Sequence, residues 1–143
     1  YRRHYILATD IDHSALDRAK AGGPYTDEEI SKAPAHLIDR YFTRHTGNAK
    51  DDGHYVIETL RRKLTFRYQN LLEGSFEREF DLIVCRNVVI YFTAEVKTRL
   101  YERFYEALRP GGVLFVGGTE IVSKASDLGF ETAGISFYRR KDS

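Results

Sequence analysis

The chain has 143 residues, which is the size of one ordinary domain and enough to bury a core. Its 22 basic and 21 acidic residues nearly balance, so its charge does not favour nonspecific binding to nucleic acid or to a membrane surface. A single cysteine excludes an internal disulfide, and the apolar runs fall short of the ~20 residues that span a bilayer, so we expect a cytoplasmic domain without membrane insertion.

The first third of the sequence predicts a strand followed by a helix. Residues 4–9 (HYILAT) form an apolar run typical of a buried strand. A helix is predicted from about His13 to Ala21, with Ser14 and Asp17 as a capping box and Gly22 as its stop. Because this strand begins so close to the first residue and the chain contains no methionine, we expect a piece of a longer protein.

The middle third changes character and predicts a small antiparallel unit. A helical turn is expected in residues 26–33 (TDEEISKA), and the loop at residues 45–53 (HTGNAKDDG) is dense in turn formers. Around that loop, three segments alternate in polarity and are not continuously apolar. They are residues 40–44, 54–60 and 64–68. We interpret them as a meander that forms an inserted β-subdomain over about 38–68 within a single domain.

The last third predicts regular alternation of strands and helices. A buried strand at residues 81–85 leads to a helix from about Ala94 to Leu108, and then to a strand at residues 113–118 (VLFVGG). A short helical segment is expected in residues 120–128. Two strands, GFETA and SFYRR, then predict a terminal antiparallel hairpin. The whole pattern predicts an α/β fold with a mostly parallel sheet.

Polar residues follow four of the predicted strands, at the sheet edge where ligands of open α/β sheets bind. These residues are Asp10, Gln69 with Asn70, Arg86 with Asn87, and the stretch 117–120. An acid after a strand suits the two hydroxyls of a ribose, but Asp12 fits the role of a helix cap equally well. Asn70 can present its amide to an adenine edge or satisfy a turn. Taken alone, each signal is weak.

Five stretches occur in the same order and spacing in a known enzyme family. They are ILATDID (6–12), RYF (40–42), LTF with NLL (64–72), FDLIVCRNVVIYF (80–92) and LRPGGVLFVGGTE (108–120). In these stretches the chain resembles the chemotaxis receptor methyltransferases of the CheR family. The resemblance implies a class I S-adenosylmethionine-dependent methyltransferase fold, a Rossmann-like sheet, here amino-terminally truncated.

The resemblance also implies an activity. CheR enzymes are protein-glutamate O-methyltransferases of bacterial chemotaxis signal transduction. They transfer a methyl group from S-adenosyl-L-methionine to glutamates of chemoreceptors (methyl-accepting chemotaxis proteins) and release S-adenosyl-L-homocysteine. The implied partner is thus the chemoreceptor cytoplasmic domain, the protein substrate. In some members the inserted antiparallel subdomain docks the receptor carboxyl terminus, and the segment at about 38–68 resembles that subdomain.

Individual site residues follow from the same resemblance. Asp10 matches the acid on the ribose, Asn70 and Leu71 match the pair lining the adenine pocket, and Arg86 and Asn87 match further cofactor-binding residues. Arg86 and Tyr91 match the catalytic pair near the transferred methyl. Other roles remain open: Arg86 can form an ion pair with Glu120 or Asp10, and Tyr91 can be a buried ring. Cys85 is expected to be inert packing, and no metal-ligand spacing is found.

The family's glycine-bearing loop and its preceding strand have no match in these residues. In this class of sheet that strand lies between the strands at 4–9 and 81–85. We therefore expect the sheet either to be split or to be repaired by a strand from another copy or chain, giving a strand-exchanged homo-oligomer. The isolated chain is expected to bind cofactor weakly or not at all. The alternative function is a non-catalytic CheR-like binding module that docks a receptor or signalling partner.

Overall fold

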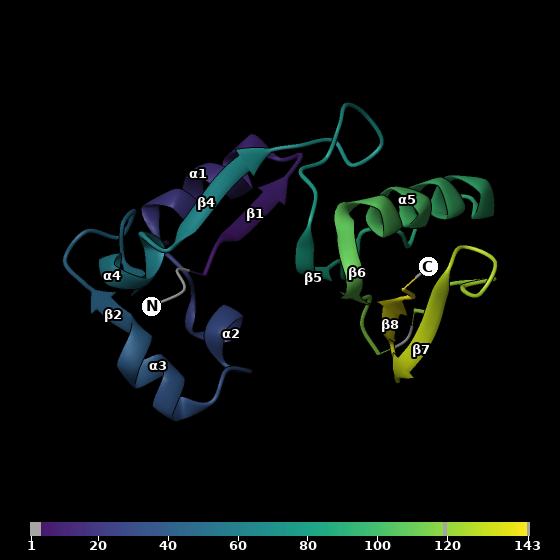
Figure 1. Ribbon diagram of the computed structural model, residues 1–143. Helices are drawn as coiled ribbons and strands as arrows, with labels where there is room; N and C mark the ends of the chain where they lie inside the picture. Colours follow the sequence, from purple (N-terminus) through teal and green to yellow (C-terminus); the bar gives the residue numbers. More distant parts are fainter. Residues whose placement is uncertain (1–3, 119, 143) are drawn as a thin grey trace. The chain divides into compact units, whose positions relative to one another are not determined.

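The computed structural model describes residues 4–118 and 120–142. The chain divides into two compact units, Tyr1–Asn70 and Leu71–Ser143, and each is described by itself. The first unit contains β1 to β4 and α1 to α4, and the second contains β5 to β8 and α5 (Figure 1). None of the helices in the described ranges is long and apolar enough to cross a membrane. The division into one domain with an inserted subdomain stays a prediction.

A parallel pair of strands is the centre of the first unit. β1 (Ile6–Asp10) pairs with β4 (Leu64–Tyr68) from Ile6 opposite Leu64 to Asp10 opposite Tyr68. The expectation that residues 64–68 form the third strand of an antiparallel meander is therefore wrong. A parallel neighbour needs a crossover connection, and helix α1 (His13–Ala21), which packs against both strands through its buried face, provides it.

Helix α1 has the predicted bounds but a different cap. The side chain of Asp12 accepts hydrogen bonds from the backbone N–H groups of Ser14 (2.8 Å) and Ala15 (3.3 Å), so Asp12 is the N-cap. The predicted capping box of Ser14 and Asp17 is therefore wrong. The Asp12 side chain, and not that of Ser14, accepts the hydrogen bonds from the backbone N–H groups of the first helical turn. Gly22, with φ of +84°, ends the helix in the left-handed conformation as predicted.

The antiparallel part of the first unit is a two-stranded hairpin. β2 (Phe42–His45) pairs with β3 (Gly53–Val56) around the predicted loop, between the short helices α2 (Asp27–Ile30), α3 (Ala35–Tyr41) and α4 (Glu58–Arg61). The predicted strand over 40–44 thus begins two residues too early, since Arg40 and Tyr41 belong to α3. Pro34 is the N-cap residue of α3, and its carbonyl accepts from the N–H groups of Leu37 and Ile38.

A capping box and an ion pair hold α2 against α1. The Thr26 hydroxyl accepts from the Glu29 N–H, the Thr26 N–H donates to the Glu29 carboxylate (2.8 Å), and Arg18 donates to both oxygens of that carboxylate. The hydrogen bond from Arg18, followed by the one from Thr26, lowers the pKa of Glu29 from its usual 4.5 to about 2. Glu29 therefore prefers the ionised form in the folded chain.

We expect Glu29→Gln to lower the melting temperature at pH 7 and to have a much smaller effect at pH 2. A carboxyl with a depressed folded-state pKa contributes stability that is fully present above its unfolded pKa of about 4.5, and that contribution is lost as the pH falls through about 2. Thermal unfolding followed by circular dichroism between pH 7 and pH 2 measures the difference. Glu28→Gln, on the same short helix, is the control. A deficit in melting temperature as large at pH 2 as at pH 7 would contradict the ion-pair explanation.

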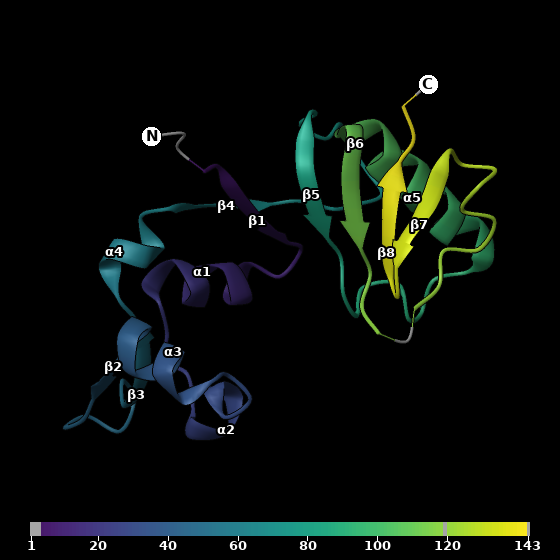
Figure 2. The ribbon, with the colours of Figure 1, turned by 60° about the horizontal axis from the view of Figure 1, so that its bottom comes forward.

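The second unit is a four-stranded mixed sheet in the order β5-β6-β8-β7 (Figure 2). β5 (Phe80–Val84) and β6 (Leu108–Phe115) are parallel, whereas β8 (Phe137–Arg140) is antiparallel to both β6 and β7 (Phe130–Gly134). The terminal hairpin and helix α5 (Ala94–Ala107) are confirmed. The helix expected in 120–128 is wrong: residues 123–129 form turns, and Lys124 has a φ of +55°, which a helix does not allow.

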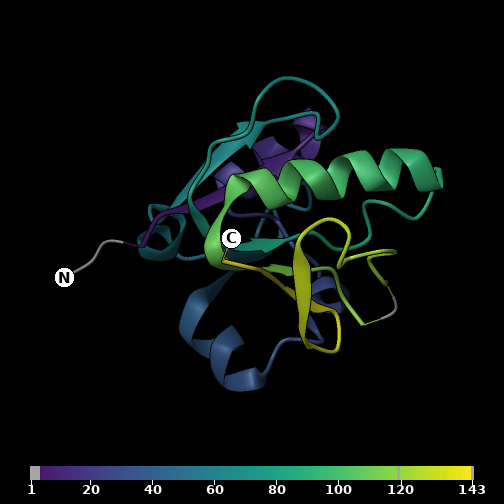
Figure 3. The ribbon, with the colours of Figure 1, turned by 45° about the vertical axis from the view of Figure 1, so that its right-hand side comes forward.

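Helix α5 covers one face of this sheet (Figure 3). Side chains alternate along each strand, so Ile83, Leu114 and Tyr138, which lie opposite one another across three strands, share the face that packs into the core. Leu114 is completely buried. Leu82 and Val84 lie on the other face and are 53% and 58% exposed. The expectation of a strand buried on both faces at 81–85 is therefore wrong for this chain.

The expected split of the sheet is confirmed. Within the part of the chain that the structure describes, β1 is hydrogen-bonded to β4 alone and β5 to β6 alone. Each of these two parallel strands thus has one edge without a neighbour, and such edges can pair with a further strand. The repair of the sheet by another copy or chain stays a prediction.

Candidate cofactor and acceptor site

Asp10 and Asn70 come to the same edge of the first unit. Asp10 ends β1 opposite Tyr68, and the Gln69 N–H donates to the Asp10 carbonyl (3.0 Å), so the parallel pairing continues to the residue before Asn70. The Asp10 side chain is exposed, and one of its oxygens accepts from the Asp12 N–H (2.9 Å). Asp12 itself caps α1, which leaves Asp10 as the acid available for a ligand in this turn.

An aromatic pair lies beside Asp10 and was missed in the sequence. The His13 ring stacks on the Tyr68 ring with centroids 4.4 Å apart and planes within 7°. The pairing of Asp10 with Tyr68 and the start of α1 at His13 together place the two rings at the same strand end. A signal was present, since aromatic residues flank both predicted strand ends, but only the parallel pairing of β1 with β4 brings them together.

Arg86 follows the carboxyl end of β5 in the second unit. The ladder with β6 runs one step further, because the Cys85 N–H donates to the Phe115 carbonyl (2.9 Å). Arg86 then lies against the backbone of Gly117, where a Cβ atom would be 3.0 Å from its Nε. Gly117 is therefore the residue that makes room for this side chain. No carboxylate of the described residues forms an ion pair with Arg86, so the predicted pair with Glu120 or Asp10 is absent from residues 4–118 and 120–142.

Asn87 bends the chain immediately after Arg86. Its φ is +58°, a conformation that asparagine tolerates better than most residues. Val89 then enters the core with 1% exposure, and the Phe92 N–H donates to its carbonyl (3.0 Å), which closes a turn before α5. Tyr91 in this turn is 95% exposed, so the alternative of a buried tyrosine ring is wrong.

A buried carboxylate oxygen adjoins this segment. Oε2 of Glu120 is buried and has no hydrogen-bond partner among the residues that the structure describes. The carboxylate lies near the buried Cys85 and Tyr101, whose pKa values are raised to about 11 and about 12, by burial first and by the charge of Glu120 second. The sequence placed Glu120 at a strand end but did not predict its burial.

Cys85 is expected to resist alkylation in the folded chain. The thiolate is the reactive form, and a pKa of about 11 leaves roughly a thousandth of the thiol ionised at pH 8. We therefore expect iodoacetamide to label the native chain about 100-fold more slowly than the urea-unfolded chain. Mass spectrometry of timed samples measures both rates, and because Cys85 is the single cysteine the signal is unambiguous. Equal rates would show that the thiol is accessible and not inert packing.

Comparison with known proteins identifies the fold and then the family. A solved structure of a possible exported protein from Bordetella parapertussis matches with a TM-score of 0.54 at 17% identity, over 95% of this chain and 53% of that chain. The model of the CheR methyltransferase, SAM binding domain, matches residues 1–138, and the chain belongs to this family. The predicted class I methyltransferase fold and S-adenosylmethionine as its cofactor are thereby confirmed.

Curated relatives agree with this assignment. A chemotaxis protein methyltransferase of Listeria monocytogenes is 44% identical over 138 residues, 95% of this chain and 50% of its own length. Chemotaxis protein methyltransferase 2 of Pseudomonas aeruginosa is 44% identical over 125 residues, 86% of this chain and 44% of its own. The chain thus spans about half the length of the curated relatives it matches.

The described residues fit such a cofactor in each unit. In the first, the Asp10 carboxylate is exposed at the end of β1, and its second oxygen is available to hydroxyl donors. In the second, the exposed residues Arg86 and Asn87 and the unpartnered oxygen of Glu120 lie at the carboxyl ends of β5 and β6. Ligands of open α/β sheets bind at this end of the strands.

Proposed function

We propose that the chain is the catalytic part of a protein-glutamate O-methyltransferase that acts on chemoreceptor glutamates in the cytoplasm. The observation that carries the proposal is the exposed guanidinium of Arg86, seated on Gly117 at the end of β5 and followed by the exposed Tyr91. Membership of the CheR family and relatives named as chemotaxis protein methyltransferases support it. The finer points, glutamate as the acceptor and a chemoreceptor as the substrate, rest on the family resemblance.

The proposed cofactor contacts are assigned residue by residue from the family resemblance. Asp10 accepts hydrogen bonds from the two ribose hydroxyls, as acids at this strand position do in dinucleotide-binding folds. Asn70 presents its side chain to the adenine edge, and Leu71, which packs partly buried against the core of the second unit, lines the adenine pocket. Asn87 and Arg86 contact the remaining part of the cofactor. When bound, S-adenosyl-L-methionine supplies an electrophilic methyl group on a sulfonium.

The acceptor chemistry makes modest demands on the side chains. A glutamate with a pKa near ~4.3 is already an anionic nucleophile at neutral pH, so no general base is required. Arg86 holds the acceptor carboxylate through two parallel N–H donors, which also fixes its direction. The hydroxyl and ring of Tyr91 orient the acceptor. Alignment of this kind can by itself supply a large part of a rate enhancement.

The test is transfer of labelled methyl groups to a chemoreceptor cytoplasmic domain. We expect base-labile methyl esters on glutamates, and we expect Arg86→Ala to lower the rate about 100-fold, the order of magnitude for loss of one preorganised donor. Arg139→Ala, which removes a surface arginine paired with Glu131, is the matched control and leaves the rate unchanged. Receptor binding with no transfer, in the chain or in any longer form that contains it, would instead favour the non-catalytic binding module.

A further inference from the structure

Four apolar side chains are exposed around the proposed acceptor position in the second unit. Their exposed fractions are 40% for Val88, 57% for Ile90, 95% for Tyr91 and 77% for Ile121. We call these four residues the apolar rim. Large apolar side chains that gather on one part of a surface mark interaction sites more often than side chains scattered singly.

Several contacts place both segments of the rim at the same end of the sheet. Arg86, before the first segment, lies on Gly117, and Cys85 lies near the charge of Glu120, beside Ile121. Val89 and Val122, which alternate with the exposed residues, are 1% and 3% exposed and belong to one core cluster. Figure 2 shows β5 and β6 ending side by side, so the segments that follow them leave from the same edge.

An exposed arginine precedes the first segment of the rim. Arg86 is exposed, and it has no ion-pair partner among the described residues. A guanidinium bordered by apolar side chains complements a carboxylate that has apolar neighbours, because burying those neighbours excludes water and strengthens the charge-assisted hydrogen bonds. A carboxylate with polar neighbours would gain the charge contact with Arg86 but no burial of apolar surface.

We propose that the apolar rim binds the protein substrate, and that it selects acceptor segments in which apolar side chains flank the glutamate. This inference rests on the proposed function and deepens it by assigning sequence selectivity to Val88, Ile90 and Ile121. Arg86 recognises the carboxylate, and the rim recognises its neighbours. The two contributions are therefore separable by substitution in the acceptor and in the chain.

Three blocked, fluorescent peptides test the proposal by anisotropy. Their centres are Leu-Leu-Glu-Leu-Leu, Ser-Ser-Glu-Ser-Ser and Leu-Leu-Gln-Leu-Leu in an otherwise identical polar sequence. We expect the first to bind at least about tenfold more tightly than the second, since burial of apolar side chains of this size readily gives that factor. Ile90→Ser or Ile121→Ser reduces this ratio to near unity. Arg86→Ala instead removes the preference for Glu over Gln and retains the preference for Leu over Ser.

Ile135→Ser is the matched control, because Ile135 is 86% exposed in the β7–β8 turn and outside the rim. Equal binding of the Leu and Ser peptides, or an equal effect of Ile135→Ser, overturns the proposal. Titration with S-adenosylhomocysteine and the methyl-transfer assay are run on the same samples. Transfer without the Leu preference means that the rim fails and the proposed function stands. The Leu preference without methyl transfer, in the chain and in a longer form that contains it, means that the rim binds the peptide as proposed and that the proposed function is wrong.

Discussion

Leu114→Ala is expected to lower the free energy of unfolding of the second unit by about 2–5 kcal/mol, the range for removing a buried leucine side chain. Leu114 is completely buried in β6, with Ile83 opposite it on one neighbouring strand and Tyr138 on the other. The same core includes Leu100 and Phe104 of α5. The substitution leaves a cavity where the sheet and the helix meet, and tightly packed surroundings fill such cavities only in part.

Leu82→Ala is the matched control for this effect. Leu82 is in the neighbouring strand β5, but it lies on the other face of the sheet and is 53% exposed. We expect a cost of about 1 kcal/mol or less, because little apolar surface returns to water. Urea unfolding followed by circular dichroism measures both variants. If the two substitutions cost the same, the core does not lie between α5 and the face that carries Leu114.

The regular elements of the fold could be predicted because local patterns determine them. Helices α1 and α5 have their predicted positions within a residue, since each combines apolar residues at helical spacing with a cap or stop signal at its ends. The partner of β4 could not be predicted in this way. Alternating polarity marks a half-buried strand, but it does not identify the neighbouring strand or its direction, which depend on the crossover through α1.

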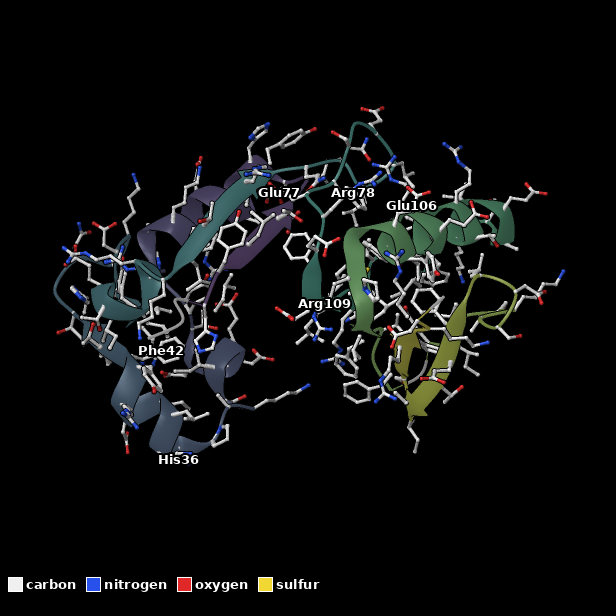
Figure 4. All side chains as sticks on the ribbon, viewed as in Figure 1. His36, Phe42, Glu77, Arg78, Glu106 and Arg109 are labelled. Carbon is white, nitrogen blue, oxygen red and sulfur yellow. The ribbon has the colours of Figure 1, made fainter. Side chains whose placement is uncertain are left out.

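The ion pair of Arg109 shows the same limit of prediction from local sequence patterns. Arg109 pairs with Asp81 across the parallel strands β5 and β6, 28 residues apart in sequence, and is labelled near the start of β6 in Figure 4. The sequence predicts Asp81 at the start of a strand but Arg109 in the turn after a helix, and only the observed pairing of β5 with β6 brings the two residues together. Long-range pairs of this kind follow from the topology and not from local spacing.

The candidate site shows where sequence reasoning succeeds and where it stops. A polar residue after an apolar strand is a local signal, and it located Asp10 and Arg86 at strand ends. The role of Gly117 was not predictable, because it depends on the approach of the Arg86 side chain from another strand. The burial of the Glu120 carboxylate oxygen also depends on packing and not on spacing.

Gly23→Ala is expected to destabilise the first unit by about 3 kcal/mol. A Cβ atom at this position would lie 2.5 Å from the backbone carbonyl oxygen of His54, which cannot move without breaking a tight bridge. In that bridge the Tyr25 N–H donates to the His54 carbonyl (2.9 Å) and the His54 N–H donates to the Tyr25 carbonyl (2.8 Å). Gly23 also has a φ of +153°, a conformation that other residues adopt only with strain of about 1–3 kcal/mol.

Gly47→Ala separates the cost of the steric collision from the cost of the backbone strain. Gly47 also has a positive φ, +119°, but nothing lies within 4 Å of the position its Cβ would occupy in the β2–β3 loop. It therefore carries the backbone strain without the collision, and we expect a cost of about 1 kcal/mol. Thermal and urea unfolding of both variants give the comparison. Equal costs would assign the whole effect to the backbone conformation, whereas the expected excess for Gly23→Ala assigns it to the bridge that joins Tyr25 to β3.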